Sequence, residues 1–164
     1  METSPAAPEP ASEAVVSVEP AGFWVRAGAY LVDGVILAAA GIGAGFVARG
    51  LGMLVGPVYK TIFVSQGGQT PGKMAAGLRV IRADGEAVSV GRALARTAAE
   101  YVSMVTLGLG YLAAAFGEKR ALHDFIAGTR VVYVDGVSSG RRTLFTVLGV
   151  LGFLAPVLGL IAGF

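Results

Sequence analysis

The chain has 164 residues, of which 54% are hydrophobic and only 15% charged, and its mean hydropathy is +0.69. Soluble domains usually carry about 25% charged residues, so this chain lacks the polar surface that a water-soluble fold needs. It has no Cys and one His, which excludes disulfides, thiolate metal sites and histidine-rich metal centres. The length suits one domain, and the composition predicts an all-α integral membrane protein. Its formal charge of +2 indicates anchoring at the cytoplasmic membrane surface, not nucleic-acid binding.

The N-terminal residues 1–22 contain four Glu and four Pro, with no Lys or Arg. Such a segment cannot bury enough apolar surface to offset the entropy lost on ordering, so we expect a disordered tail. A secretory signal peptide would begin with a basic region, and this segment begins with none.

Two apolar segments follow the tail. Residues 24–48 are long enough for a bilayer core of about 30 Å, and from residue 27 onward Asp33 is their single charge. Residues 51–66 form a shorter segment with Lys60 near its C-terminal end, where the long side chain can reach the interface. A tight break separates the two segments, which predicts a helical hairpin.

Two polar regions, residues 67–96 and 119–142, carry five Lys or Arg each. In the first, alternating segments at 78–83 and 86–90 flank an Asp-Gly dipeptide that is typical of β-hairpin turns. In the second, residues 129–134 have the pattern of a strand. An isolated strand would leave its backbone unpaired, so we expect it to join the hairpin in a small three-stranded element on the cytoplasmic side.

The remaining apolar segments are residues 92–116 and, after a basic linker at 136–142, residues 143–164. The last segment is uncharged and long enough to span. Positive charge predicts that both polar regions are cytoplasmic, yet a single span by residues 97–116 would separate them. Either this segment is a re-entrant hairpin bent at residues 108–110, which we favour, or it spans against the charge rule. We expect a bundle of three to four transmembrane or re-entrant segments, with a cytoplasmic N-terminus.

Residues 67–74 fit most of the phosphate-binding pattern G-x-x-x-x-G-K, but Met74 stands where a hydroxyl would bind magnesium. We therefore interpret the segment as a turn that leaves the membrane with Lys73 at the lipid headgroups. The pair His123-Asp124 invites comparison with metal phosphohydrolases, which need further His ligands that this chain lacks. The pattern favours a helix near the interface whose Asp124 pairs with a nearby Arg.

Several charges fall within or beside the apolar segments. Arg26 and Asp33 share one helix face but lie about 10 Å apart along its axis, so each needs another partner. Lys60 is the candidate for Asp33. Arg96 and Glu100 belong to one polar stripe on the third segment. Such charges either form buried ion pairs that fix helix packing or relay protons or cations.

Together these segments resemble the RDD family of bacterial membrane proteins, named for one Arg and two Asp residues. The matching pieces are residues 24–33, 68–73, 77–80, 91–96 and 122–129. The resemblance implies that Arg26, Asp33 and Asp124 are the name-giving residues. It also implies motif roles for Gly68, Gln69, Thr70, Pro71, Gly72, Lys73, Arg79, Arg96, His123, Gly128 and Thr129.

The resemblance implies a role in transport, with links to cation–proton exchange. We therefore expect a multi-pass protein of the inner (cytoplasmic) membrane, working as a homo-oligomer. Its candidate functional charges are Arg26, Asp33, Lys60, Glu100 and Asp124. The alternative is a non-catalytic accessory or scaffold whose basic face binds anionic headgroups or a partner protein. No nucleophile–base pair is evident in the sequence, so we expect no enzyme, no cofactor and no metal.

Overall fold

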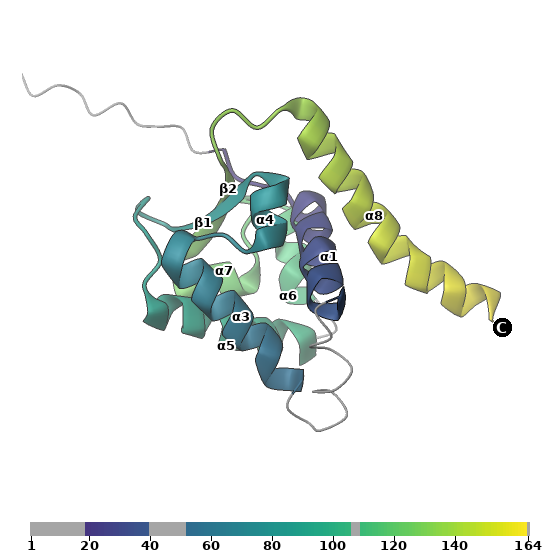
Figure 1. Ribbon diagram of the computed structural model, residues 1–164, viewed down its shortest axis with the longest axis horizontal. Helices are drawn as coiled ribbons and strands as arrows, with labels where there is room; N and C mark the ends of the chain where they lie inside the picture. Colours follow the sequence, from purple (N-terminus) through teal and green to yellow (C-terminus); the bar gives the residue numbers. More distant parts are fainter. Residues whose placement is uncertain (1–18, 40–51, 106–108, 164) are drawn as a thin grey trace, which may run out of the picture.

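The computed structural model describes residues 19–39, 52–105 and 109–163. A small sheet lies at one end of the helical body, and the last helix runs along one side of the body and beyond it (Figure 1). The elements in chain order are α1 (Phe23–Ala39), α3 (Gly52–Gly67), α4 (Pro71–Ala76), β1 (Leu78–Arg82), α5 (Val90–Val105), α6 (Leu109–Leu112), the 3₁₀ turn η1 (Ala113–Ala115), α7 (Leu122–Ala127), β2 (Thr129–Tyr133) and α8 (Ser139–Ala162). The expected mainly helical fold with a small β element is confirmed.

Helix α8 is apolar and largely uncovered. Among the described residues it is the one helix long and apolar enough to cross a bilayer, with a mean hydropathy of 2.4 over 18 residues. Only 11% of that window is buried, whereas the core helix of a soluble protein would be mostly buried. Leu151 and Leu158 are more than half exposed, so the helix needs apolar surroundings. The further membrane segments of the expected bundle stay a prediction, and residues 1–18 and 40–48 of the predicted tail and first helix lie outside the described residues.

The sheet joins the two polar regions of the sequence. Strands β1 and β2 pair antiparallel, with Val80 opposite Val131, and both valines are buried. The expected pairing of the second polar region with the first is therefore confirmed.

The third strand predicted at residues 86–90 is wrong. The edge of β1 that it would use is already occupied, because Val80 N donates to the Gly68 carbonyl at 2.7 Å and the Gln69 amide donates to Leu78 O at 2.8 Å. Residues 86–89 instead run irregularly into α5, where the backbone N of Arg92 in the first turn donates to Ser89 Oγ. The sheet has two strands.

Helix α6 packs against α5. Gly110 of α6 packs so closely on Ser103 of α5 that a Cβ at Gly110 would overlap the Ser103 hydroxyl. Since β1 precedes this pair of helices and β2 follows it, the chain returns to the sheet end from which it left. Residue 108 of the bend predicted at residues 108–110 lies outside the described residues, and the re-entrant form stays a prediction.

Helix α4 replaces the simple turn predicted at residues 67–74. Thr70 caps its N-terminus, Pro71 occupies its first position, and Gly77 ends it in the left-handed conformation at φ 69°. Gly72 allows α4 to touch α1, since a Cβ there would overlap the Ala29 carbonyl. The motif therefore builds a short helix against the interior.

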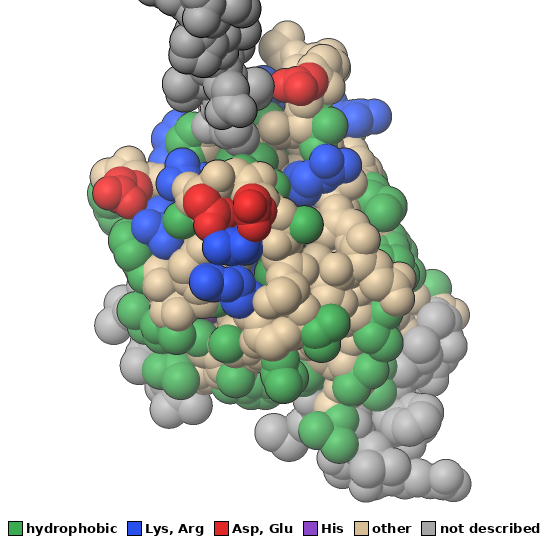
Figure 2. All heavy atoms as spheres, turned by 90° about the vertical axis from the view of Figure 1, so that its left-hand side faces the viewer, with side chains coloured by type: hydrophobic (Ala, Val, Ile, Leu, Met, Phe, Trp, Pro, Cys, Tyr) green, Lys and Arg blue, Asp and Glu red, His purple; other side chains and the backbone are tan. Residues whose placement is uncertain are grey.

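Charge is segregated on the surface. Figure 2 shows Lys, Arg, Asp and Glu gathered toward the sheet end of one face, and hydrophobic side chains without charges toward the opposite end. At the sheet end Arg82 forms ion pairs with the exposed Asp84 and Glu86. This division is the one expected for a protein whose apolar end is in lipid.

Candidate functional site

Seven ionisable side chains from α1, α4, α5 and α7 are gathered in the interior, each 5% exposed or less. A buried charge is costly unless it is paired, so the partners of each member decide what the group can do. We call this group the buried charge cluster; its members are Arg26, Asp33, Lys73, Arg96, Glu100, His123 and Asp124.

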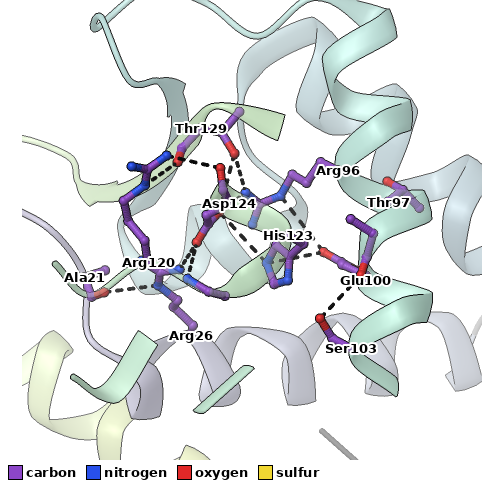
Figure 3. Close-up of polar contacts among 12 residues, drawn as sticks. Ala21, Arg26, Arg96, Thr97, Glu100, Ser103, Arg120, His123, Asp124 and Thr129 are labelled. Carbon is purple, nitrogen blue, oxygen red and sulfur yellow. Dashed lines mark hydrogen bonds and ion pairs between the residues drawn. The ribbon is translucent and has the colours of Figure 1, made fainter. Parts of the chain in front are cut away.

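Asp124 binds two arginines at once (Figure 3). Its Oδ2 accepts from Arg26 Nη1 at 2.5 Å and from the backbone N of Ala121 at 3.0 Å, while its Oδ1 accepts from Arg96 Nη1. Burial alone would raise the pKa of Asp124, but the guanidiniums of Arg96 and Arg26 outweigh burial and hold that pKa well below its usual range. The expected pairing of Asp124 with a nearby Arg is confirmed, and the carboxylate pairs with two arginines, not one.

The two arginines extend this contact into the backbone. Arg26 Nε donates to Ala21 O at 3.0 Å, its Nη2 donates to Lys119 O, and Arg96 Nη1 donates to Thr129 Oγ1 at 2.9 Å. The group therefore links α1, α5, α7 and β2 around one carboxylate. Charge-assisted hydrogen bonds of this kind are the strong class, so this part of the cluster is a structural brace.

Glu100 is the second acidic centre. It accepts from Lys60 Nζ and, at 2.9 Å, from Tyr30 OH, and His123 Nε2 lies 4.0 Å from its Oε1. The predicted pairing of Lys60 with Asp33 is wrong, because α3 packs chiefly against α5 and so carries Lys60 to Glu100.

His123 is buried beside this centre. Burial and the nearby Arg96 lower the pKa of His123 to about 3, so its imidazole is neutral at physiological pH. Its Nδ1 has no hydrogen-bond partner within the described part of the chain.

Asp33 fixes the start of α4. Its carboxylate accepts from Thr70 Oγ1 at 2.6 Å, from the backbone N of Gly72 at 2.7 Å and from Tyr59 OH at 2.9 Å. Arg26 and Asp33 thus have separate partners, as their axial separation predicted. Three hydrogen-bond donors, and no cation, satisfy this carboxylate in the described structure.

Lys73 is 3% exposed, which corrects the expectation that it lies at the headgroups. Its ammonium makes one long hydrogen bond, 3.5 Å to Thr70 Oγ1, and lies 4.6 Å from the centroid of the Tyr30 ring. Among residues 19–39, 52–105 and 109–163 it forms no ion pair. Burial and the charge of Arg96 lower the pKa of Lys73 to about 8, against the opposing effect of Glu100 and Asp33.

The other motif positions act on the backbone. Gly68 and Gly128 have positive φ values of 69° and 62°, which end α3 and α7 sharply. Gln69 accepts from the exposed Arg79 at 3.4 Å, so that arginine stands outside the cluster. Sequence reasoning missed Tyr30, although its position four residues after Arg26 placed it on the same helix face.

No three His, Cys, Asp or Glu side chains of the described residues are grouped so that they could hold a metal ion.

The chain can also be compared with known protein families. The family model of the RDD family matches residues 20–128. The chain belongs to the RDD family. Among its relatives is YxaI, an uncharacterized protein of Bacillus subtilis (strain 168), which is 33% identical over 70% of this chain and 98% of the relative. Another is YckC of the same organism, also uncharacterized, 34% identical over 70% of this chain and 85% of the relative. No solved structure matches this RDD protein.

The residues that resemble the name-giving positions of the RDD family all lie in the buried charge cluster. Arg26 and Asp124 are in direct contact, and Asp33 holds the start of α4 two helical turns along α1. The family resemblance therefore coincides with the two contacts that lock α1 to α7 and to α4.

Proposed function

We propose that this RDD protein is a small multi-pass transporter of the cytoplasmic membrane that exchanges protons through the buried charge cluster. The observation that carries the proposal is the cluster itself. Ionisable side chains inside membrane proteins are costly, and they typically mark ion pathways or proton relays. A purely structural brace needs balanced pairs, whereas this cluster, counted with Lys60 and with His123 neutral, holds four positive charges against three negative ones.

The pairing of β1 with β2 supports the membrane arrangement that we propose. Both polar regions then lie on one side, and the intervening α5–α6 pair enters and leaves by that side. Helix α8 begins at Ser139 near the sheet and ends far from it (Figure 1), so it crosses to the opposite side. With the N-terminus in the cytoplasm, the C-terminal end of α8 is outside.

The chemistry of proton exchange is assigned to Lys73 and Glu100. Lys73, with a pKa of about 8, can gain and lose a proton near physiological pH, unlike the strongly paired Asp124. Glu100 lies between Lys60 and the neutral His123, where it stabilises a mobile positive charge. One copy offers few helices to enclose a pathway, so we include a homo-oligomer in the proposal.

Proteoliposomes that contain a pH-sensitive dye test the proposal. An imposed gradient of sodium, potassium or an organic anion should move protons when the wild-type protein is present, and Glu100→Gln should lose this flux. Glu118→Gln is the matched control, because the Glu118 side chain is 71% exposed. Equal proton leak in wild-type, Glu100→Gln and protein-free vesicles would exclude transport.

A second candidate function is that of an accessory protein at the headgroup surface. It is favoured by exposed arginines around the sheet end, among them Arg79, Arg92 and Arg141. Clustered basic side chains at a membrane surface attract anionic lipids. Flotation assays that compare nanodiscs with and without anionic lipid would detect such binding. The double variant Arg79→Gln, Arg92→Gln should weaken it.

A further inference from the structure

A cavity of about 340 Å³ lies between α1, α8 and the α6–α7 region, beside the buried charge cluster. This volume is at the lower end of the range, roughly 300–1,000 Å³, that small-molecule sites occupy. Much of its wall is apolar, and these lining residues include Phe23, Ala27, Leu31, Ala114, Gly149 and Phe153.

The charged side chains that line this cavity are all basic, namely Arg26, Lys73 and Arg96. The two arginines are already neutralised by Asp124. Lys73 is not, because its one hydrogen bond is the 3.5 Å contact with a hydroxyl that itself donates to Asp33. The cavity therefore presents one buried positive charge without an anionic partner among the described residues.

A second lining residue also lacks a partner. His123 is 2% exposed, and its Nδ1 makes no hydrogen bond within the described structure. Buried polar atoms are normally satisfied, so an unsatisfied imidazole nitrogen on the wall of a cavity indicates a missing polar group. Lys73 and His123 thus place two polar groups without a strong partner among the described residues on the lining of one cavity.

We propose that this cavity binds a medium-chain fatty acid, with the carboxylate at Lys73 and the hydrocarbon chain between α1 and α8. A carboxylate supplies the one negative charge that Lys73 lacks, and a doubly charged phosphate monoester would exceed it. The hydrocarbon chain would contact Phe23, Leu31 and Phe153, which are apolar. An alcohol of equal length would leave the ammonium unpaired, and an alkylammonium would meet like charges.

A fatty acid as the transport substrate would deepen the proposed function, and that part of the inference rests on the proposed function. The binding site itself rests on the cavity alone. Binding should weaken as the pH rises above about 8, because Lys73 then loses its proton. The ionisable groups that act on Lys73 are Asp33 and Tyr30 of α1, Lys60 of α3, and Arg96 and Glu100 of α5.

Binding can be measured with terminally brominated decanoate in phosphatidylcholine nanodiscs, where bromine quenches Trp24, the single Trp of the chain. The Trp24 ring is 5.8 Å from the ring of the cavity residue Phe153. Brominated decanol is the control, because it measures the quenching that is caused by probe dissolved in the lipid. We expect saturable quenching by the carboxylate at neutral pH, at least tenfold stronger than by the alcohol, as one charge-assisted hydrogen bond provides.

Four variants test the assignment. Lys73→Met should weaken decanoate binding about tenfold or more, Lys73→Arg should restore much of it, and Lys119→Met, at an exposed lysine outside the cavity, should leave it unchanged. Ala27→Leu fills part of the cavity and leaves the Lys73 ammonium in place, so it should also weaken binding, which covers the case in which Lys73→Met does not fold. Equal quenching by acid and alcohol, or full affinity in both Lys73→Met and Ala27→Leu, would overturn the site.

The experiment separates the site from the transport proposal, because the nanodiscs carry no gradient. Saturable decanoate binding supports the site even if no protein-dependent flux is found in proteoliposomes, a result that would remove only the transport function. Cation-driven proton flux without decanoate binding would instead overturn the site and leave transport standing.

Discussion

Arg26 and Asp124 are 98 positions apart in the chain, and a 2.5 Å contact joins the guanidinium Nη1 of one to the carboxylate Oδ2 of the other. The same carboxylate binds Arg96, so it ties together helices that the sequence separates widely. Both guanidiniums are almost fully buried, which means that neither can turn to water if the carboxylate is lost.

Asp124→Asn should therefore destabilise the protein strongly. An amide cannot balance two buried guanidiniums, and breaking a buried ion pair costs roughly 3–5 kcal/mol. The free energy of unfolding in detergent, followed by Trp24 fluorescence, would measure the loss. Asp84→Asn is the control, since the Asp84 side chain is half exposed and its ion pair with Arg82 should contribute about 1 kcal/mol or less. Similar stabilities of the two variants would show that Asp124 is not a structural centre.

The packing of α8 on α1 gives a second prediction. Gly149 touches the backbone of α1, where an added Cβ would overlap the Trp24 carbonyl, while Gly159 faces open space. Gly149→Ala should therefore move α8 away from α1 and lower stability by about 1–3 kcal/mol, and Gly159→Ala should not.

Crosslinking of Trp24→Cys to Phe153→Cys with a short bifunctional thiol reagent would report the α1–α8 contact, since this chain has no other Cys and the two rings are 5.8 Å apart. The crosslink should form less readily in the Gly149→Ala background. Unchanged crosslinking in both glycine variants would contradict the close approach of the two helices.

Patterns that depend on neighbouring residues could be predicted from the sequence. The apolar run that forms α8 and the strands at 78–82 and 129–133 follow from hydropathy and alternation, and the pairing of the two strands follows because an isolated strand would leave its backbone unpaired. The third strand was wrong because the competing backbone of Gly68 comes from another part of the chain. Helix α4 was missed because six residues give little periodicity, although Thr70-Pro71 is a good N-terminal cap.

Partners of the buried charges were less predictable. The excess of basic residues was enough to predict that Asp124 contacts an arginine. The identity of that arginine depends on how α1, α5 and α7 pack. Lys60 was predicted to pair with Asp33, but α3 packs on α5, so Lys60 pairs with Glu100 instead. Axial distances along two helices do not determine which face each helix turns to a third.

Lys73 should destabilise the folded protein at neutral pH. Its pKa is about 8 in the folded state against 10.5 for a free lysine, so the folded state binds fewer protons between these values. Stability should therefore rise with pH across this interval, and the full penalty should be present below it. Lys73→Met removes the charge, so the variant should be more stable than wild type at neutral pH by on the order of 1–3 kcal/mol.

Thermal unfolding of wild type and Lys73→Met at several pH values checks this expectation. The difference in stability should shrink as the pH approaches 10.5. Arg141→Met, at an exposed position, should show no such trend. A Lys73→Met variant that is less stable than wild type at neutral pH would mean that the ammonium has a strong anionic partner in the folded protein.

The sheet makes a definite prediction about membrane sidedness. Because β1 and β2 pair, the exposed residues Asp84 and Gly136, which follow these strands, must lie on the same side of the bilayer. Gly163 follows the far end of α8 and should lie on the other side. Single Asp84→Cys, Gly136→Cys and Gly163→Cys variants can be labelled with a membrane-impermeant maleimide in intact cells and in inverted vesicles. We expect the first two to react in inverted vesicles and the third in intact cells. If Asp84→Cys and Gly136→Cys reacted from opposite sides, residues 90–115 would cross the membrane, and the antiparallel pairing of β1 with β2 could not exist in the membrane-inserted protein.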